Sequence, residues 1–570
     1  MLNFRAPSAL LEIIKAIIVI LLPFVGEAQN TVGLLTYNAE APIEDYLLIY
    51  PEQQSTAFLL DACGQIVHRW EDNDFGARPG AVAYLLPDGQ LLRAKRYAPL
   101  FEGPTFGSGG AGGVVELVSW DNEVLWTYVV ADNTERQHHD VHYLPNGHIL
   151  ILAYDLIEEE ELIASGFDTL SYPQQSLWSE KIIEVDPLTD SIHWEWRAWD
   201  HLVQDVDETA ENYGEVSAHP GRINLNYQVF TMGREDWIHA NAIDYNEELD
   251  QIMISARNFN EVWIIDHSTT TAEAATNTGG NSNRGGELLW RWGSPHTYNQ
   301  GTLDDQQLFS QHDAQWIDDF VSEDYPYYGA IAVFNNFINF SVEEGLSQGQ
   351  IIAPVWETNT PSYAQENDVF LPNDFSATFV HPDTAKTFSS NASSIQILDD
   401  GHVLMCVARQ GRVFELDTEG TLIWEYLTPL RFGQPFPQGG NLNLGENFTF
   451  QAKKYPATYS AFVDKDLSPQ GYLELNPDEA YCSVVATTEP NEEEIIATVF
   501  PNPSTGQFSV NVSTEAIGEM LTVSDLRGVL ISQQLLKTNH TVLDLSNYPV
   551  GMYLLQVSGK SEVEKLMLIK

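Results

Sequence analysis

The chain has 570 residues, of which 81 are Asp or Glu and 27 are Lys or Arg, so its formal net charge is −54. So acidic a chain argues against nucleic acid and anionic lipid as partners, because both bind through Lys and Arg. The length exceeds what one ordinary core holds, and we therefore expect one large domain and a smaller one.

The three cysteines, Cys63, Cys406 and Cys482, are too few and too scattered for a disulfide framework or a zinc motif. At most one disulfide can form, and the spacing does not identify the pair. We favour thiols without a bonding role.

The N-terminus has the pattern of a signal peptide. Arg5 and Lys15 precede an apolar run over 16–25, and small residues follow up to Ala28. The run is short for a membrane span, and no other stretch is long and apolar enough to cross a bilayer. We expect residues 1–28 to be removed and the mature protein to be exported, with no membrane span.

A repeated unit follows, in which an apolar strand, an Asp-Gly-like turn and a second strand lead to a run that ends in tryptophan. The markers are Trp70, Trp126, Trp194, Trp290, Trp356 and Trp424. The longest gap holds a polar insertion at about 200–236. Four short strands in each of about six units predict an all-β chain with a β-propeller.

Composition divides the rest of the chain. We expect the propeller over residues 30–482 and a linker rich in Thr, Pro and Glu over 483–494. Fresh alternation of apolar and polar residues over 495–570 predicts a small C-terminal β-sandwich.

Histidines head three of the predicted inner strands, at His139, His239 and His312. The repeats show that the blade itself does not require them, since the position eight residues before the turn glycine is Ala81 in one unit and Ser393 in another. Inner strands of a propeller begin near one end of the central channel. We therefore predict that the three imidazoles share a site, with scattered structural histidines as the alternative.

Arg257 adds a fixed cation, 18 residues after His239 and across the hairpin of the same unit. A guanidinium beside imidazoles suits a tetrahedral oxyanion such as a sulfuryl or phosphoryl group. A zinc site made of the three histidines is the rival interpretation, which a neighbouring Arg257 disfavours. The chain has no P-loop and no GxSxG motif, which argues against a nucleotide-binding P-loop enzyme and against serine hydrolase chemistry. We expect no cofactor and no metal.

Residues 33 to about 456 resemble the bacterial arylsulfate sulfotransferases, which take sulfate from a phenolic ester. The matching motifs are His138-His139-Asp140, Trp237-Ile238-His239-Ala240-Asn241, Ser255-Ala256-Arg257-Asn258, Gln311-His312-Asp313-Ala314 and Phe450-Gln451-Ala452-Lys453-Lys454-Tyr455. The resemblance implies a six-bladed propeller and a ping-pong transfer between two phenols.

Carried over residue by residue, the resemblance implies that His312 is the nucleophile that becomes sulfated. His239 and Arg257 would bind the sulfuryl oxygens, and His139 would assist. His138 is the alternative to His139, and we include His138 and Asn241 as candidate substrate-binding residues. Asn335 stands where the family often has Asp.

The C-terminal residues resemble the type A sorting domain of the type IX secretion system. The matching stretches are Phe500-Pro501-Asn502-Pro503-Ser504-Thr505-Gly506, Asp525-Leu526-Arg527-Gly528 and Lys565-Leu566-Met567-Leu568-Ile569-Lys570. The resemblance implies that the type IX machinery is a partner, and that the protein is secreted or attached to the outer-membrane surface.

Two other functions fit the same sequence. One is a non-catalytic surface propeller that binds glycans or proteins, and the other is a sulfatase-like hydrolase in which water replaces the phenol acceptor. For the phenol ring we consider Trp237 and Trp316, although core packing is their expected role.

Overall fold

The computed structural model of this chain describes residues 30–569, with gaps at 39–44, 73–76, 97–108, 171–174, 228–234, 338–345, 358–359, 480–481, 483–496, 503, 513–515, 526–528 and 559–562. The predicted signal peptide and linker lie outside the described residues. The chain forms two compact units that divide after Cys482, and each is considered by itself.

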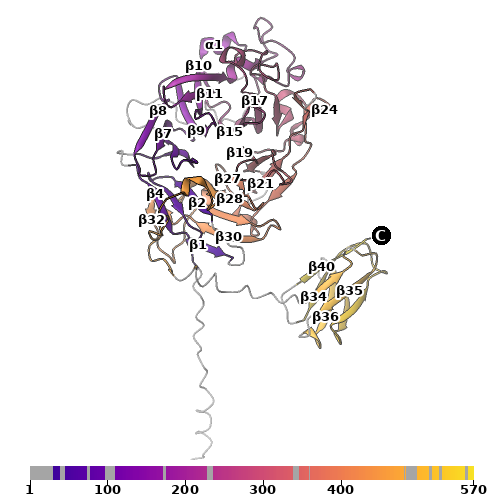
Figure 1. Ribbon diagram of the computed structural model, residues 1–570. Coiled ribbons are helices and arrows are strands. Elements are labelled where there is room, and N and C mark those ends of the chain that lie inside the picture. The colour runs from indigo at the N-terminus through magenta and orange to yellow at the C-terminus, as the bar shows by residue number, and fades with distance from the viewer. Residues whose placement is uncertain are drawn as a thin grey trace, which may run out of the picture. The chain divides into compact units, whose positions relative to one another are not determined.

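The first unit contains six antiparallel blades, which surround a common centre (Figure 1). From the inner to the outer strand they are as follows: blade one, β33 (Thr449–Tyr455), β2 (Tyr46–Pro51), β3 (Ala57–Leu60) and β4 (Ile66–Trp70); blade two, β5 (Pro79–Leu85), β6 (Leu91–Arg96), β7 (Gly113–Val118) and β8 (Val124–Val129); blade three, β9 (Glu135–Tyr143), β10 (Ile149–Glu158), β11 (Ser176–Asp186) and β12 (Ser191–Arg197); blade four, β15 (Ala240–Asn246), β16 (Gln251–Ala256), β17 (Glu261–Asp266) and β18 (Trp290–Trp292); blade five, β19 (His312–Trp316), β20 (Ile331–Asn335), β21 (Gln348–Ile352) and β26 (Ala377–Phe379); blade six, β27 (Ser394–Ile397), β28 (Val403–Val407), β29 (Arg412–Leu416) and β30 (Leu422–Leu427).

The inner strands form a closed ring, because each contacts the inner strands of both neighbouring blades. The order around the ring is β33, β5, β9, β15, β19 and β27, and β27 contacts β33 again. The predicted six-bladed propeller is confirmed. Apolar side chains fill the space between adjacent blades, as between blades three and four, where Trp194 and Trp263 belong to one buried cluster. The core is therefore distributed around the ring.

Both ends of this unit close the ring. Strand β33 supplies the inner strand of blade one, with Tyr455 opposite Tyr46, and β1 (Gly33–Tyr37) lies on the outer edge of blade six. A disulfide joins Cys63 to Cys482, whose Cα atoms are 5.6 Å apart. Our preference for non-bonded thiols is wrong for this pair, because the ring brings together two cysteines that are 419 residues apart in the chain. Cys406 is free and buried.

The tryptophan markers lie on the fourth strands of five blades, as the repeat predicts. For blade five the predicted position of the tryptophan is wrong. Trp356 lies in β22 (Trp356–Glu357), which pairs with β23 (Ser362–Tyr363) outside the blade, and the fourth strand is β26. Trp356 packs against Tyr363 instead, with ring centroids 4.8 Å apart.

Short elements lie between the main strands. They are α1 (Glu159–Ala164), α2 (Thr271–Ala274), the parallel pair β13 (Leu202–Val203) and β14 (Ile223–Asn224), the hairpins β24 (Gln365–Glu366) with β25 (Val369–Phe370) and β31 (Leu430–Arg431) with β32 (Gln434–Pro435), and the 3-10 turns η2 (Ala198–His201), η3 (Val216–Ala218), η4 (Arg257–Phe259), η5 (Pro295–Tyr298), η6 (Leu303–Asp305), η7 (Thr384–Lys386), η8 (Ala408–Gln410) and η9 (Ser460–Phe462). The described part of the chain contains no helix long and apolar enough to span a membrane.

Inner-strand aspartates link consecutive blades. Asp140 of blade three accepts a hydrogen bond from the Ile243 backbone in blade four at 2.9 Å. Asp244 accepts from Trp316 in blade five at 2.6 Å, and Asp313 accepts from Ile395 in blade six at 2.9 Å. These charge-assisted bonds fix the inner strands that carry the histidines.

The second unit is the predicted small β-sandwich. One sheet contains β34 (Ala497–Phe500), β35 (Gln507–Val512) and β38 (His540–Asp544), and the other contains β37 (Leu530–Leu535), β36 (Met520–Asp525), β39 (Gly551–Val557) and β40 (Val563–Leu568). Alternating residues such as Phe508, Val510 and Leu555 are buried between the sheets.

Candidate active site at the inner strands

The structure brings four predicted site residues together. His139 lies on β9, His239 directly precedes β15, His312 begins β19, and Arg257 begins the η4 turn after β16. The rings of His139 and His239 lie 4.7 Å apart. Burial lowers the pKa of His139 well below 6.5, and the neighbouring basic groups, with His239 first and Arg257 among them, lower it further. The sequence positions of these groups span 174 residues from His139 to His312, and only the ring makes them neighbours.

The backbone turns at the histidines are unusual. His139 has φ 51° and His239 has φ 55°, both in the left-handed region that side chains rarely adopt. In blades three and four the pairing of the first two strands shifts register near these histidines. In blade three the shift lies between the pairs Gln137–Ala153 and Val141–Ile151. The bulge turns His139 away from the alternation of its strand, which is a common device next to functional sites.

Gly110 closes over His139. Its φ is +68°, and a Cβ atom there would lie 2.2 Å from Cδ2 of His139. The Gly110 carbonyl also accepts a hydrogen bond from the His139 backbone at 2.8 Å. Only glycine permits this approach.

His138 lies between His139 and Glu180. Its side chain is fully buried, stacked on Tyr154 with centroids 3.6 Å apart. Its Nε2 lies 2.8 Å from the Glu180 carboxylate, and its Nδ1 lies 2.9 Å from Nδ1 of His139. Of the two histidines, His139 is therefore the one beside His239, and His138 contacts it from behind.

A carboxylate holds His239. Asp236 Oδ2 lies 2.5 Å from Nδ1 of the ring, so that this nitrogen carries a proton toward the carboxylate. An Asp–His pair of this kind fixes the orientation of the ring and the nitrogen that is left for a ligand. The other nitrogen, Nε2, lies close to Gly109, the residue before Gly110. A Cβ atom added at Gly109 would be 4.0 Å from it.

Arg257 supplies the permanent charge. Its guanidinium donates to Asn258 Oδ1 at 2.9 Å, and Asn258 in turn donates to the Asp236 carbonyl at 3.0 Å. Burial lowers the pKa of Arg257, which nevertheless stays cationic at neutral pH. Within the described ranges, Arg257 forms no salt bridge with a carboxylate. A partly buried guanidinium of this kind is a site for an anion.

His312 is held as one tautomer. Its Nδ1 lies 2.8 Å from Asn336 Oδ1 and 3.0 Å from the Ser310 carbonyl. The amide group of Asn336 donates to the carbonyls of Ser389 and Ala392, so its oxygen faces the ring. Both neighbours are acceptors, and Nδ1 must therefore carry the proton while Nε2 keeps a lone pair.

The charge state of His312 follows from its surroundings. Burial lowers its pKa well below 6.5, and Arg257 and His239 add positive charge nearby. The ring is therefore neutral at physiological pH. A neutral imidazole with a free Nε2 lone pair next to a guanidinium is a nucleophile beside an anion-binding group.

The remaining predicted residues have other surroundings. Asn241 is buried, and its amide donates to the Gln311 carbonyl at 2.8 Å, next to His312. Trp237 and Trp316 lie in hydrophobic core clusters, as expected. Phe450 on β33 lies beside the site, with its ring centroid 6.0 Å from that of His139 and 6.2 Å from that of His312.

Asn335 has a packing role. It accepts from the Phe309 backbone at 2.8 Å and donates to the Gln307 carbonyl and to the Gln350 side chain. These hydrogen bonds connect the segment before His312 to β20, and all of the partners of Asn335 are uncharged. The residue that contacts the His312 ring is Asn336, the next residue in the chain.

Four residues that contact the predicted site were not predicted from the sequence: Asn336, Asp236, Glu180 and Gly110. Asp236 lies three residues before His239, and Asn336 directly follows Asn335, so both stand in stretches that the motifs already mark. Glu180 lies on β11 and Gly110 in a loop between β6 and β7. No local signal connects these two to the histidines.

Comparison with known proteins identifies both units. The profile of the arylsulfotransferase (ASST) family matches residues 89–429, and that of the secretion system C-terminal sorting domain matches residues 498–570. No curated protein matches the chain.

The solved structures that match the chain are distant. A protein of unknown function from Bacteroides caccae is 10% identical, with a TM-score of 0.37, and the match covers 72% of this chain and 98% of that one. A streptogramin B lyase is 11% identical with a TM-score of 0.31 (75% and 99% covered). A catalytically inactive variant of virginiamycin B lyase from Staphylococcus aureus is 8% identical with a TM-score of 0.31 (71% and 92% covered). TM-scores this low carry no information about function.

The first family match covers more than half of the chain and contains every predicted site residue, and the second matches the C-terminal unit. The sorting domain directs export and attachment at the cell surface. The chain belongs to the arylsulfotransferase family and carries a C-terminal sorting domain for secretion.

Proposed function

We propose that this protein transfers a sulfuryl group from a phenolic sulfate ester to a phenolic acceptor through a sulfated His312. The observation that carries the proposal is the fixed tautomer of His312. Asn336 and Ser310 occupy Nδ1 as acceptors, which leaves the Nε2 lone pair free beside Arg257.

In the first half-reaction Nε2 of His312 attacks sulfur. An N–S bond forms, the ester S–O bond breaks, and the phenolate leaves. Neither Asn336 nor the Ser310 carbonyl is a base, so the Nδ1 proton stays on the ring and the sulfated imidazole remains positively charged. That charge makes the ring a good leaving group for the second transfer.

His239 is suited to the proton transfers. The Asp236 carboxylate occupies Nδ1, so Nε2 is the nitrogen that gives a proton to the departing phenolate. The neutral ring that results can take the proton of the incoming phenol, whose oxygen attacks sulfur and releases His312. Arg257 balances the charge that spreads over the sulfuryl oxygens in both steps.

The phenol ring needs an apolar surface next to the sulfuryl group. The Phe450 ring lies at similar distances from the rings of His139 and His312. We assign it the contact with the phenol, by edge or face packing.

The test is the release of phenolate from a chromogenic aryl sulfate with and without a second phenol. Release that depends on the second phenol, with sulfate found on that phenol, is the expected result. Release that is equally fast in water alone would identify a hydrolase. Failure of several donors to react would favour the non-catalytic binding propeller.

Replacing Gly110 with alanine is expected to reduce kcat/KM by about 100-fold, because the new methyl group would displace the His139 ring. The control is Gly420→Ala, which imposes similar backbone strain at φ +83° but has no heavy atom within 4 Å of the added Cβ. Equal losses in the two variants would show that strain, and not the position of His139, is responsible.

Replacing Arg257 with glutamine should lower kcat/KM by about 10²- to 10³-fold, as expected for the loss of one oxyanion-stabilising donor. It should also move the acid limb of the pH profile to higher pH. The attacking form of His312 is neutral, so activity is lost as pH falls through its pKa. Burial and then Arg257 depress that pKa, and removing the arginine raises it in part.

The matched control for this measurement is Arg409→Gln. Arg409 lies in η8, the turn that follows the second strand of blade six as η4 does in blade four. Arg409 is absent from the charges that depress the pKa of His312. An acid limb that stays in place in Arg257→Gln would contradict the assigned role of the guanidinium.

A further inference from the structure

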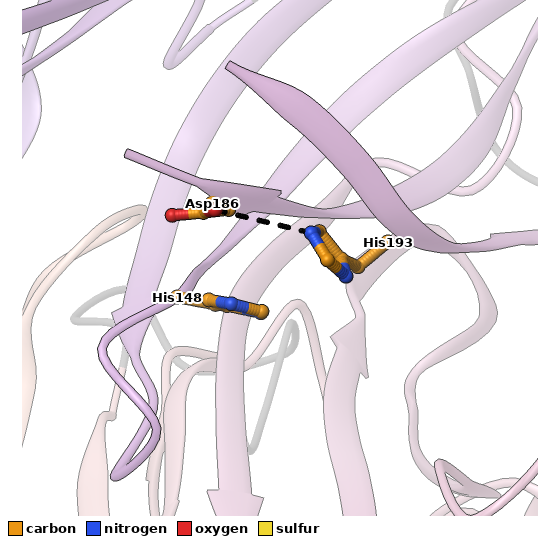
Figure 2. Close-up of side chains that lie close together, drawn as sticks. All are labelled: His148, Asp186 and His193. Carbon is orange, nitrogen blue, oxygen red and sulfur yellow. Dashed lines mark ion pairs between the residues drawn. The ribbon is translucent and has the colours of Figure 1, made fainter. Parts of the chain in front are cut away.

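A second histidine cluster lies on blade three, away from the inner strands. His148 is the residue before β10, Asp186 ends β11 and His193 lies on β12, and their candidate ligand atoms all lie within 4.8 Å of one another (Figure 2). Figure 2 shows the two imidazoles and the carboxylate turned toward a common space. We propose that these three side chains bind a divalent transition-metal ion, with zinc as the best-matched example.

The ligand set selects the class of ion. Two imidazole nitrogens and one carboxylate oxygen suit zinc and its neighbours, whereas calcium and magnesium prefer oxygen ligands throughout. Around a tetrahedral zinc the ligand atoms would be about 3.3 Å apart, for bonds of about 2.0 Å. His193, whose side chain is 48% exposed, can close that distance by rotating about its side-chain bonds. Solvent would complete the coordination.

The first ligand is already oriented for this role. Nδ1 of His148 lies 2.6 Å from Glu184 Oε1, so that Nδ1 carries the proton and Nε2 is left for an ion. Glu184 is itself held by His267 at 3.1 Å. A carboxylate behind a ligating histidine is the usual second partner in zinc sites, where it fixes the tautomer and strengthens the ligand.

The second proposed ligand is His193, and the repeated blade pattern does not account for a histidine at its position. His193 occupies a bulge of the fourth strand, between the pairs Glu184–Trp194 and Val185–Ile192. The same bulge in three other blades holds an apolar residue: Val67 in blade one, Leu125 in blade two and Ile423 in blade six. The blade therefore does not require a histidine here.

Asp186 also has a turn-forming role. It accepts from the Leu188 backbone at 2.8 Å and from the Thr189 hydroxyl at 2.7 Å. Its Oδ2 lies 4.0 Å from Nε2 of His193, and the anionic charge favours a cation between them.

Blade six supplies a natural comparison. Asp400, His402 and Glu415 form a similar cluster, with His402 at 2.9 Å from both carboxylates. It has one imidazole, and its bulge residue is Ile423. Of these two clusters, which are those that the described residues form, only blade three offers the two nitrogen ligands that favour a transition ion.

Such an ion would connect the turn before β10 to the ends of β11 and β12, the two outer strands of the blade. It would hold the edge strand without taking part in sulfuryl transfer. We therefore expect the ion to raise the thermal unfolding temperature of the propeller and to leave the transfer rate unchanged.

The test uses the full chain, freed of metal with a chelator and titrated with Zn²⁺ alone by calorimetry, with Co²⁺ absorption as a second reading. His193→Leu and His148→Gln introduce the residues found at the same places in blade two, Leu125 and Gln90. We expect the wild type to bind one equivalent of Zn²⁺ that both variants lose and that the control His402→Gln keeps.

Two results would overturn the proposal. One is that the wild-type chain binds no Zn²⁺. The other is that His193→Leu binds the same number of equivalents as the wild type, which would place the ion elsewhere, for example at the inner-strand histidines, where inhibition of transfer would reveal it. Unchanged melting of the metal-free variants would show that they fold.

Discussion

Replacing His312 with alanine is expected to abolish acceptor-dependent phenolate release, with a fall in kcat of about 10³-fold or more, as for the loss of other catalytic nucleophiles. The free Nε2 lone pair is the only attacking group that we assign, and its orientation comes from Asn336 and Ser310. In the wild type, brief incubation with a donor alone should add the mass of one SO₃ group to the peptide that contains His312.

The matched control is His201→Ala, which removes another buried histidine. His201 stacks on Trp196, on an outer strand of blade three, with centroids 5.7 Å apart. This variant should keep its transfer activity. If His312→Ala stayed active, or if the added mass were found on another residue, the covalent path through His312 would be wrong.

Replacing Arg291 with methionine is expected to lower the free energy of unfolding of the propeller by about 3 to 5 kcal/mol. Arg291 and Glu261 are both fully buried, and the guanidinium reaches the carboxylate through Nε at 3.1 Å and Nη2 at 2.6 Å. Methionine would leave the Glu261 charge buried and without its counter-ion. Urea unfolding monitored by tryptophan fluorescence measures the change.

The double variant Arg291→Met/Glu261→Gln separates the charge from the packing. A glutamine keeps an oxygen to accept from Trp263 Nε1, which now donates to Glu261 at 2.7 Å, and its amide group can donate to Thr297. It should recover most of the lost stability. Equal destabilisation in the single and double variants would show that lost packing, and not the unpaired charge, sets the cost.

This ion pair also bears on the site. Glu261 directly follows the turn that contains Arg257, and its backbone carbonyl accepts from the Gln311 side chain at 2.8 Å, one residue before His312. We therefore expect Arg291→Met to reduce activity at temperatures below global unfolding, by loosening both segments.

The sequence predicted the architecture because a propeller repeats a local pattern. Turn glycines, alternating apolar residues and terminal tryptophans recur within each unit and do not depend on the rest of the chain. Even Phe320, at the place of the turn glycine in blade five, adopts a left-handed φ of 59°. The prediction failed at Trp356, where a hairpin insertion displaces the fourth strand to β26 and keeps the tryptophan outside the blade.

Ring closure was not predictable from local pattern. The strand that completes blade one comes from Thr449–Tyr455, after the last repeat, and the disulfide between Cys63 and Cys482 joins positions near both ends of the unit. Pairings of this kind depend on contacts across several hundred residues. No alternation or spacing within either segment encodes them.

The sequence by itself determined the family and the sorting domain, which short motifs carry. It also predicted the histidine and arginine positions of the proposed site, from motifs and from differences between aligned repeats. Tertiary structure alone decided which of His138 and His139 lies beside His239. The left-handed bulge at His139 breaks the two-residue alternation from which a sequence predicts side-chain direction. Tertiary structure also supplied Asn336 and Asp236, because hydrogen bonds that set an imidazole tautomer join separate segments and depend on distances that the sequence does not specify.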